Sequence, residues 1–519
     1  MNQITRRPTP RRPARPDQFI RTLTVTAAAL AAMQLAACGQ PQGGTAQAPD
    51  SNSPTTAKPG AQPAALAPAN APFTSAQAQS ILQTLSHASD EGFAPSAFGD
   101  VRQIGGLIVS SDPAEAARGQ RLLRAAVIKY ARAQHGFGLP TDQFPKEWGI
   151  RPARYDADLD LRAAQGSNRI DDWLKALPPP HDRYQALVKA LAAYRAIAAQ
   201  GGWPNLPVHG RLRQGAGGRT VEALKARLAV EDPSAAQAAP GGTYDAALAQ
   251  AVSRFQSRHQ LEPTGEVGPK TWAALNVPVE TRIDQIRANL ERWRWLPRNP
   301  PATRIEVDAA SDTMDYYQDG KDVLHMLAAS GRPGDETPML ISEIIDIKFN
   351  PPWRVPATIA RKELFPKERR NPGYFARNDF IKGPSADVPL VQQAGPKSAL
   401  GQVKFEFDNA YGVYLHDTPA KHAFTLDARE VSHGCVRLER AVDLAKTLLT
   451  GVKGYSPAEI DQLVTTDETK FVNVPRPVPV MLFYWTAYVQ DGQSYFGSDA
   501  YGWDDIVVRL LDAAAPGSA

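Results

Sequence analysis

Residues 432–438 read Ser-His-Gly-Cys-Val-Arg-Leu, and Cys435 among them is one of only two cysteines in the 519 residues. The other cysteine, Cys38, belongs to an N-terminal export signal. Cys435 is therefore left without an intramolecular partner in a compartment that normally oxidises cysteine pairs. A lone exported thiol suggests a nucleophile, and the competing interpretation is a buried, inert cysteine.

The N-terminus predicts export. Six arginines precede an apolar run over residues 22–37, which is short for a membrane span. The run ends in Leu-Ala-Ala-Cys, which resembles a bacterial lipobox, so we expect a lipoprotein signal peptide over residues 1–37 and lipidation of Cys38, whose multiple acyl chains would anchor it stably. The alternatives are a plain signal peptide cut nearby and a twin-arginine export route.

The positive charge of the chain lies in this signal. The full chain has a net charge of +4, but residues 1–37 hold six arginines and one aspartate, so the chain from Cys38 onward has a net charge of −1. A nucleic-acid-binding protein needs a basic face on its folded part. Nucleic acid is therefore not an expected partner.

Composition and periodicity then divide the chain into segments. Residues 38–72 are rich in Gly, Pro, Ala, Gln, Ser and Thr, which predicts a disordered tether. Residues 73–204 show helical spacing and predict a helical scaffold domain. Residues 277–303 predict an amphipathic connecting helix, and residues 304–512 are strand-rich and predict a β-rich domain that contains Cys435. The fold class expected is α+β multidomain.

Residues 205–276 form a distinct unit in this pattern. They contain short amphipathic helices separated by glycine turns, the tightest of which is at Thr264 and Gly265. The order of these elements resembles the small three-helix peptidoglycan-binding domain of bacterial wall enzymes, although Thr264 stands where that family usually has an aspartate. We expect a peptidoglycan-binding-like domain, with a purely structural spacer as the alternative.

A cysteine nucleophile needs a base and donors for the oxyanion, and both are available near Cys435. His416 lies 19 residues before it, at the end of an expected strand, and can act as the base. His433 and Gly434 directly precede the cysteine, where a glycine permits a sharp turn that exposes backbone N–H groups. A neighbouring imidazole is expected to lower the pKa of the Cys435 thiol.

Zinc is the rival interpretation, because His416, His422, His433 and Cys435 are ligand types that zinc prefers. The spacing disfavours it: His433 and Cys435 are too close together for the usual ligand pairs, and the chain has no CxxC or HExxH motif. His433 can also be an ordinary hydrogen-bonded structural residue beside a catalytic Cys435.

Residues 414–419, Tyr-Leu-His-Asp-Thr-Pro, and residues 432–437, Ser-His-Gly-Cys-Val-Arg, together resemble the active-site signature of the L,D-transpeptidases. The resemblance is to the large proteobacterial type, in which a helical scaffold and a peptidoglycan-binding domain precede a YkuD-type catalytic domain. Further family motifs follow in order at 350–356, 395–401, 404–407 and 484–487, so the resemblance covers about residues 75–510. Asp312 and Thr313 depart from the apolar pattern expected of an early strand.

The resemblance implies a β-sandwich-like catalytic domain with a capping insertion at about residues 357–400. It implies these roles: Cys435 as nucleophile, His416 as general base, the backbone carbonyl of Asp417 as the orienter of that base, His433 and Gly434 in the oxyanion hole, and Tyr414, Trp353, Arg437 and Ser432 in substrate binding. Arg437 suits a peptide with free carboxylates, because a guanidinium can bind a carboxylate with two hydrogen bonds. No metal and no organic cofactor is required.

The activity that this resemblance implies is peptidoglycan cross-linking. Cys435 would release D-alanine from a tetrapeptide stem and form a thioester, which an amine on a neighbouring stem would resolve. A hydrolase that resolves the thioester with water, and a non-catalytic peptidoglycan-binding lipoprotein, are the alternatives. The expected partners are donor and acceptor stem peptides, a membrane through Cys38, and other wall-synthesis enzymes, in the periplasm at the outer membrane.

Overall fold

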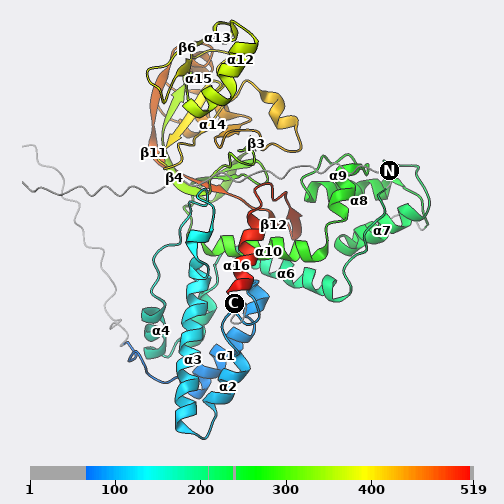
Figure 1. Cartoon of the computed structure of the whole chain (residues 1–519), viewed down its shortest axis with the longest axis vertical. Coiled ribbons are helices and arrows are strands. Elements are labelled where there is room, and N and C mark those ends of the chain that lie inside the picture. Colours follow the sequence, from blue (N-terminus) through cyan, green and yellow to red (C-terminus); the bar gives the residue numbers. More distant parts are fainter. Residues whose placement is uncertain (1–65, 209, 238–240, 515–519) are drawn as a thin grey trace, which may run out of the picture. The chain divides into compact units, whose positions relative to one another are not determined.

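The computed structural model describes residues 66–208, 210–237 and 241–514 (Figure 1). The predicted signal peptide, Cys38 and most of the predicted tether lie outside these residues. The tether was expected to extend to residue 72, but residues 66–72 pack against the helices that follow. Ala67 is buried, and its carbonyl accepts a hydrogen bond from Arg162, while the carbonyl of Ala71 accepts one from Arg124. These side-chain donors explain why residues 66–72 pack against the helices, although their composition suggested a tether.

Helices fill the first part of the described chain: α1 (Ser75–Ser86), α2 (Val101–Ile108), α3 (Pro113–Arg132), α4 (Ala157–Gly166), α5 (Ile170–Ala176) and α6 (Asp182–Ala199), with short turns η1 (Ala88–Glu91), η2 (Ala133–Phe137) and η3 (Thr141–Gln143). Their starts follow from local chemistry. Thr74 and Gln77 form a capping box on α1, and the side chain of Asp112 caps α3, which has a proline in its first turn. Their apolar faces share one core that includes Ile81 and Leu123.

Three further helices form a unit with its own core: α7 (Arg219–Glu231), α8 (Ala246–Arg258) and α9 (Pro269–Leu275), with the turn η4 (Pro233–Gln237). The tight turn at Thr264 and Gly265 is held by Gln256, whose side chain accepts a hydrogen bond from the Gly265 N–H at 2.9 Å and donates one to the Glu266 carbonyl at 2.7 Å. The Thr264 hydroxyl accepts a hydrogen bond from the Glu266 N–H at 3.2 Å, so threonine closes this turn without an aspartate.

The predicted connecting helix is more deeply buried in the structure than an amphipathic helix would be. Helix α10 (Val279–Arg294) is buried over most of its surface, including most of its charged residues. These charges are tolerated because each has a partner: Arg292 pairs with Asp504 of α16 (Trp503–Ala513) at 2.6 Å, and Arg294 pairs with Glu291 at 2.7 Å. The charged residues that suggested a solvated face lie inside the protein.

The catalytic region is a closed barrel and not the predicted β-sandwich. Its strands are β1 (Arg304–Asp308), β2 (Thr313–Gln318), β3 (Lys321–Ala329), β4 (Leu340–Phe349), β8 (Val403–Phe407), β9 (Leu415–His416), β10 (Val436–Leu438) and β11 (Lys470–Phe483). They close in the order β1-β11-β4-β8-β9-β10-β3-β2, and only β1–β11 and β9–β10 are parallel pairs within this described barrel. Strand β10 pairs with β3, so β8, β9 and β10 belong to the same sheet as β3, β2 and β1. The two separate sheets of a sandwich therefore do not form.

Alternating side chains of these strands fill the barrel core. Val403, Phe405, Leu415 and Val436 are fully buried there, and helices α14 (Ala441–Leu448) and α15 (Pro457–Leu463) pack against the same core. Since successive side chains of a strand point to opposite faces, the residues between these apolar ones lie on the outer face of the barrel.

The predicted capping insertion forms a small layer of its own. Its elements are β5 (Trp353–Val355), α11 (Ala357–Ile359), η5 (Ala360–Leu364), α12 (Phe365–Arg370), α13 (Tyr374–Arg377), β6 (Phe380–Lys382) and β7 (Leu390–Gln392). The strands form a sheet in the order β5-β7-β6, and a separate hydrophobic cluster stabilises it. The hairpin β12 (Ala487–Gln490) and β13 (Gln493–Phe496) and the turn η6 (Lys421–Thr425) complete the described elements.

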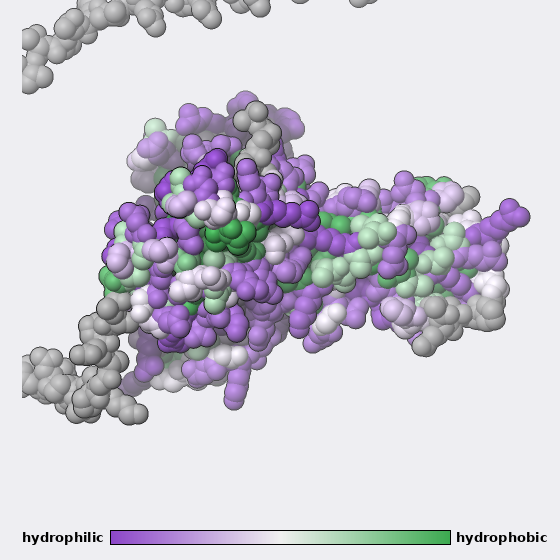
Figure 2. Space-filling model, turned by 90° about the horizontal axis from the view of Figure 1, so that it is seen from below, coloured by the Kyte–Doolittle hydropathy of each residue, from purple (hydrophilic) through white to green (hydrophobic). Residues whose placement is uncertain are grey.

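The face of the molecule in Figure 2 carries mostly polar side chains. Hydrophilic residues cover most of the face in Figure 2, and apolar residues show between them in separate patches. No helix among the described residues is long and apolar enough to cross a membrane.

Candidate active site

Three neighbouring strands bring the predicted catalytic residues to one face of the barrel. Lys404 of β8 is opposite His416 of β9, and His416 is opposite Arg437 of β10, so these three side chains form one row across the strands. By the same register, Tyr414 and Cys435 are neighbours in the adjacent row. The two rows lie on the outer face, opposite the side chains that fill the core.

The Cys435 thiol is half-buried and is the only free cysteine among the described residues. Burial raises its pKa above the ordinary value, although hydrogen bonding to Tyr414 and the positive charges of Lys404 and Arg437 act in the opposite direction. The predicted lowering of the thiol pKa is therefore wrong for this structure. Cys435 rests as a neutral thiol, because burial outweighs the cationic neighbours.

His416 is fully buried, and burial, together with the positive charges of Arg437 and Lys404, lowers the pKa of its imidazole to about 3. Its Nδ1 lies 2.5 Å from the carbonyl oxygen of Asp417. A carbonyl can only accept a hydrogen bond, so Nδ1 carries the hydrogen and Nε2 is the acceptor, as a general base requires. The described residues contain no hydrogen bond between His416 and Cys435, so the two side chains must approach each other for proton transfer.

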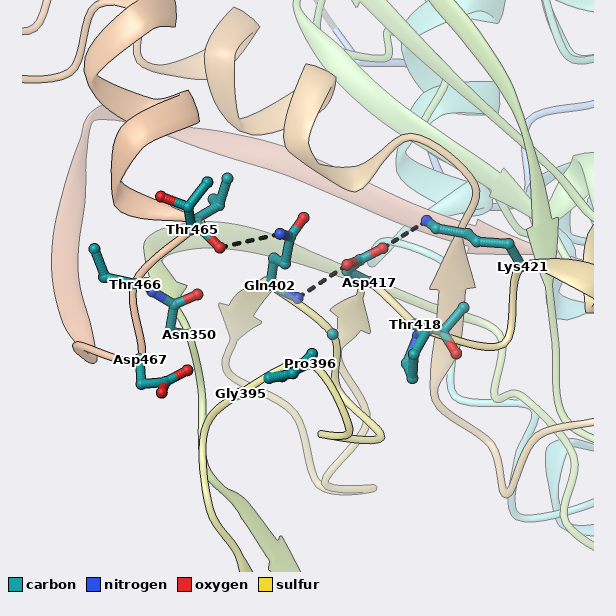
Figure 3. A pocket seen from close by; sticks show the side chains of 13 residues that line it. Asn350, Gly395, Pro396, Gln402, Asp417, Thr418, Lys421, Thr465, Thr466 and Asp467 are labelled. Carbon is teal, nitrogen blue, oxygen red and sulfur yellow. Dashed lines mark hydrogen bonds and ion pairs between the residues drawn. The ribbon is translucent and has the colours of Figure 1, made fainter. Parts of the chain in front are cut away.

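The Asp417 carboxylate borders a cavity of about 380 Å³ (Figure 3). It pairs with Lys421 at 2.6 Å and accepts a hydrogen bond from the backbone N–H of Gln402 at 2.9 Å. The main-chain carbonyl, and not the side chain, therefore contacts the imidazole. The remaining lining residues are Asn350, Gly395, Pro396, Gly401, Thr418, Pro419, Val464, Thr465, Thr466 and Asp467.

The turn before Cys435 is held by Ser432. The Ser432 hydroxyl donates to the Cys435 carbonyl at 2.5 Å and accepts from the Gly434 N–H at 3.2 Å, and Ser432 is almost fully buried. Ser432 thus shapes the turn, and its role in substrate binding stays a prediction. Gly434 has φ +100°, which favours glycine, but its N–H is already engaged. In the described chain, the N–H groups of His433 and Cys435 have no hydrogen-bond partner, which leaves them available to an oxyanion.

The His433 ring faces the capping insertion. Its Nε2 lies 2.6 Å from Glu363 of η5 and 2.9 Å from Arg332, and Arg332 also pairs with Glu363 at 3.1 Å. Burial alone would raise the pKa of Glu363, but these two partners hold it below the usual value. The cap is thereby linked to the turn that carries Cys435. No local pattern points to Glu363, since its partners Arg332 and His433 are distant in the chain.

Tyr414 and Arg437 lie near the thiol, and Trp353 lies near Tyr414. The Tyr414 hydroxyl acts on Cys435 as a hydrogen-bond donor, and Trp353 of the cap in turn donates to Tyr414. Arg437 is half-buried, and no hydrogen bond to its guanidinium exists within the described chain. An unpaired guanidinium beside a nucleophile can receive a substrate carboxylate.

The sequence analysis assigned no role to two charged residues of this face, Lys404 and Glu406, although both lie in the family motif at residues 404–407. They pair at 2.6 Å. The alternation of Val403, Phe405 and Phe407 with these two residues was the available signal, since it puts both charges on the face of His416. His422, one of the four side chains weighed as zinc ligands, lies in η6, and the described residues hold no cluster of three or more His, Cys, Asp and Glu side chains placed to bind a metal.

Three segments of the chain match known families. Residues 302–460 match the family model described as the L,D-transpeptidase catalytic domain, residues 69–191 match a scaffold domain, and residues 217–275 match a "Putative peptidoglycan binding domain". A curated relative from Haemophilus influenzae, "Putative L,D-transpeptidase", is 30% identical over 243 residues. That alignment covers 43% of this chain and 49% of the relative, so the chain spans about half the length of the curated relative that it matches.

Solved structures match the catalytic region at low identity. The catalytic domain of an E. faecium L,D-transpeptidase acylated by ertapenem is 19% identical, with 36% of this chain and 99% of that chain covered and a TM-score of 0.20. An L,D-transpeptidase from Xylanimonas cellulosilytica is 18% identical, with 53% and 99% covered and a TM-score of 0.18.

Proposed function

Because this chain carries an L,D-transpeptidase catalytic domain together with a scaffold domain and a peptidoglycan binding domain, we propose that it cross-links peptidoglycan by acyl transfer through Cys435. The observation that carries the proposal is the arrangement of two paired strands. They put Cys435 and His416 on one face of the barrel, with the Asp417 carbonyl fixing the imidazole as a neutral base.

In the first step, the Cys435 sulfur attacks the amide carbonyl between the diamino acid and the terminal D-alanine of a tetrapeptide stem, while the thiol proton moves to Nε2 of His416. The N–H groups of His433 and Cys435 hold the oxyanion. The C–N bond then breaks, and His416 returns the proton to the leaving amine. D-alanine departs and a thioester remains on Cys435.

In the second step, a side-chain amine of a neighbouring stem attacks the thioester. His416 accepts a proton from this amine, the C–S bond breaks, and the protonated imidazole restores the thiol. Arg437 would hold a stem carboxylate during both steps, because its guanidinium has no protein partner in the described chain. Neither step uses a metal or an organic cofactor.

The experiment is mass spectrometry of muropeptides after the purified protein is incubated with tetrapeptide-containing wall fragments. Cross-linked dimers with loss of D-alanine are expected from the wild type and not from Cys435→Ala. Free tripeptides alone would assign the domain to hydrolysis by water. Turnover that survives in Cys435→Ala would refute Cys435 as the nucleophile.

A second measurement separates an enzyme from a protein that only binds the wall. A catalytic thiol is expected to be acylated by a carbapenem, so intact mass should increase by one carbapenem in the wild type and stay unchanged in Cys435→Ala. A wild-type protein that takes up no carbapenem and gives no turnover would favour the non-catalytic alternative.

For location, we propose that Cys38 carries lipid and anchors the protein in the outer membrane facing the periplasm. The support is the apolar run that ends in Leu-Ala-Ala-Cys. Replacement of Cys38 by alanine should move the exported protein from the membrane fraction to the soluble fraction. A Cys38→Ala variant that stays with the outer membrane would contradict the anchor.

A further inference from the structure

The ammonium of Lys404 is held in one place by two contacts beside the candidate nucleophile. It lies 2.6 Å from Oε1 of Glu406 and 3.8 Å from the centre of the Tyr414 ring, and the side chain is only 17% exposed. Glu406 also pairs with Lys348, at 3.1 Å. Lys348 is 18% exposed, so the two lysines share a partner and a similar burial, but Lys348 lies over the Phe471 ring whereas Lys404 lies over the Tyr414 ring.

Tyr414 connects Lys404 to the thiol. The carbonyl of Tyr414 accepts the Val436 N–H at 3.1 Å, which places Tyr414 beside Cys435, and its hydroxyl interacts with the sulfur. A cation over an aromatic face is attracted by the ring, which fixes the ring's position. A positive charge near sulfur also favours the thiolate over the thiol.

We propose that Lys404 is a positioning residue for the nucleophile: it holds the Tyr414 phenol against Cys435 and supplies the positive charge that favours the thiolate as the proton leaves the sulfur. This inference rests on the proposed role of Cys435. Lys404 is not a binding group for substrate, since its ammonium is already engaged by Glu406 and the ring. Arg437, which lacks such partners in the described chain, is the residue suited to a carboxylate.

Other charged and titratable groups lie on the strands and the cap around the Tyr414–Cys435 pair. These groups also affect the pH dependence of the reactivity of Cys435. They are Lys348 and Asp346 on β4, Lys404 and Glu406 on β8, His416 on β9, Arg437 on β10, and His433 with its cap partner Glu363. The effect of Lys404 must therefore be measured as a difference between variants that leave the rest of this set in place.

The test is the pH dependence of alkylation of Cys435 by iodoacetamide in the full chain, with the label located by peptide mapping. Lys404→Met should raise the midpoint by about half a pH unit to one unit, which lowers the rate at pH 7 about three- to tenfold. Lys404→Arg, which keeps the charge and the ring contact, should restore most of the wild-type profile. Lys348→Met is the matched control and should move the midpoint less than half as far.

A Lys404→Met profile that coincides with the wild type, or an equal shift in Lys348→Met, would overturn the proposal. If Lys404→Met does not fold, Glu406→Gln gives a test of opposite sign. Loss of this counter-charge leaves Lys404 uncompensated, so the midpoint should fall, and a midpoint that stays or rises contradicts the inference. The assay needs no wall substrate, so its failure is distinct from failure of the Cys435→Ala experiment.

Discussion

Asp312 gives the protein a pH-dependent stability that can be measured directly. This residue lies in the turn between β1 and β2 with φ +52°, is 3% exposed, and accepts a hydrogen bond from the Ser330 N–H at 3.0 Å. The Ser330 carbonyl in turn accepts the N–H of Ser432, so the residue supports the loop against which the Cys435 turn is built. Burial and the nearby Glu430 raise the pKa of Asp312 to about 7.

The size of this pH dependence follows from the linkage between proton binding and folding. An aspartate whose pKa is 3.8 when unfolded and about 7 when folded binds more protons in the folded state at every pH between these values. Its contribution is fully favourable below pH 3.8 and is lost as the pH rises through 7. Asp312→Asn removes this titration. The free energy of unfolding of the variant relative to the wild type should therefore be greater at pH 8 than at pH 5 by about 2.5 kcal/mol.

The assay is urea unfolding of the full chain at pH 5 and pH 8, for the wild type and for Asp312→Asn. Because the comparison is a difference of differences, other titrating groups such as Asp308 cancel. Asp491→Asn is the matched control, since Asp491 also lies in a hairpin turn with φ +50° but is exposed. The free energy of unfolding of Asp491→Asn relative to the wild type should be the same at pH 5 and pH 8. If the value for Asp312→Asn is also the same at both pH values, the predicted role of Asp312 is refuted.

Three further changes have defined outcomes. Gly434→Ala should lower muropeptide turnover at least tenfold, because its φ of +100° strains any other residue and it lies in the turn that carries Cys435. Gly412→Ala, which also places alanine at a positive φ (+67°) but outside that turn, should leave turnover unchanged. Arg292→Met leaves Asp504 as an unpaired buried charge and should cost about 3–5 kcal/mol in urea unfolding. Arg437→Met should raise KM about tenfold for stems with free carboxylates and leave KM for amidated stems unaltered.

The elements with local signals were predictable from the sequence. The helical first half and the strand at 403–407 follow from spacing, and the Cys435 and His416 positions follow from their motifs. Barrel closure was not predictable, because it depends on the parallel pairing of β1 with β11, which are far apart in the chain. The burial of α10 was also missed, since Arg292 has its partner Asp504 in a helix 212 residues later.

Within the candidate site, sequence reasoning located the groups but not their charge states. A neighbouring imidazole was expected to lower the thiol pKa, yet burial raises the pKa of Cys435 and lowers that of His416. This balance depends on how completely the strands and the cap exclude water, which spacing does not reveal. The Glu363 contact with His433 depends likewise on where the cap packs.

A site in which thiol and imidazole both rest neutral must generate its nucleophile during the attack itself, as the proton passes from Cys435 to His416. Positive charge near the sulfur assists that transfer, and Arg437 and Lys404 both supply it. If Arg437 binds a stem carboxylate, its charge is largely neutralised at the moment when it is needed. The Lys404 ammonium is paired with Glu406 inside the protein, so its effect on the sulfur is the same before and after a stem binds. On the two proposals above, Arg437 would select the stem that is bound, and Lys404 would set how readily the bound stem is attacked.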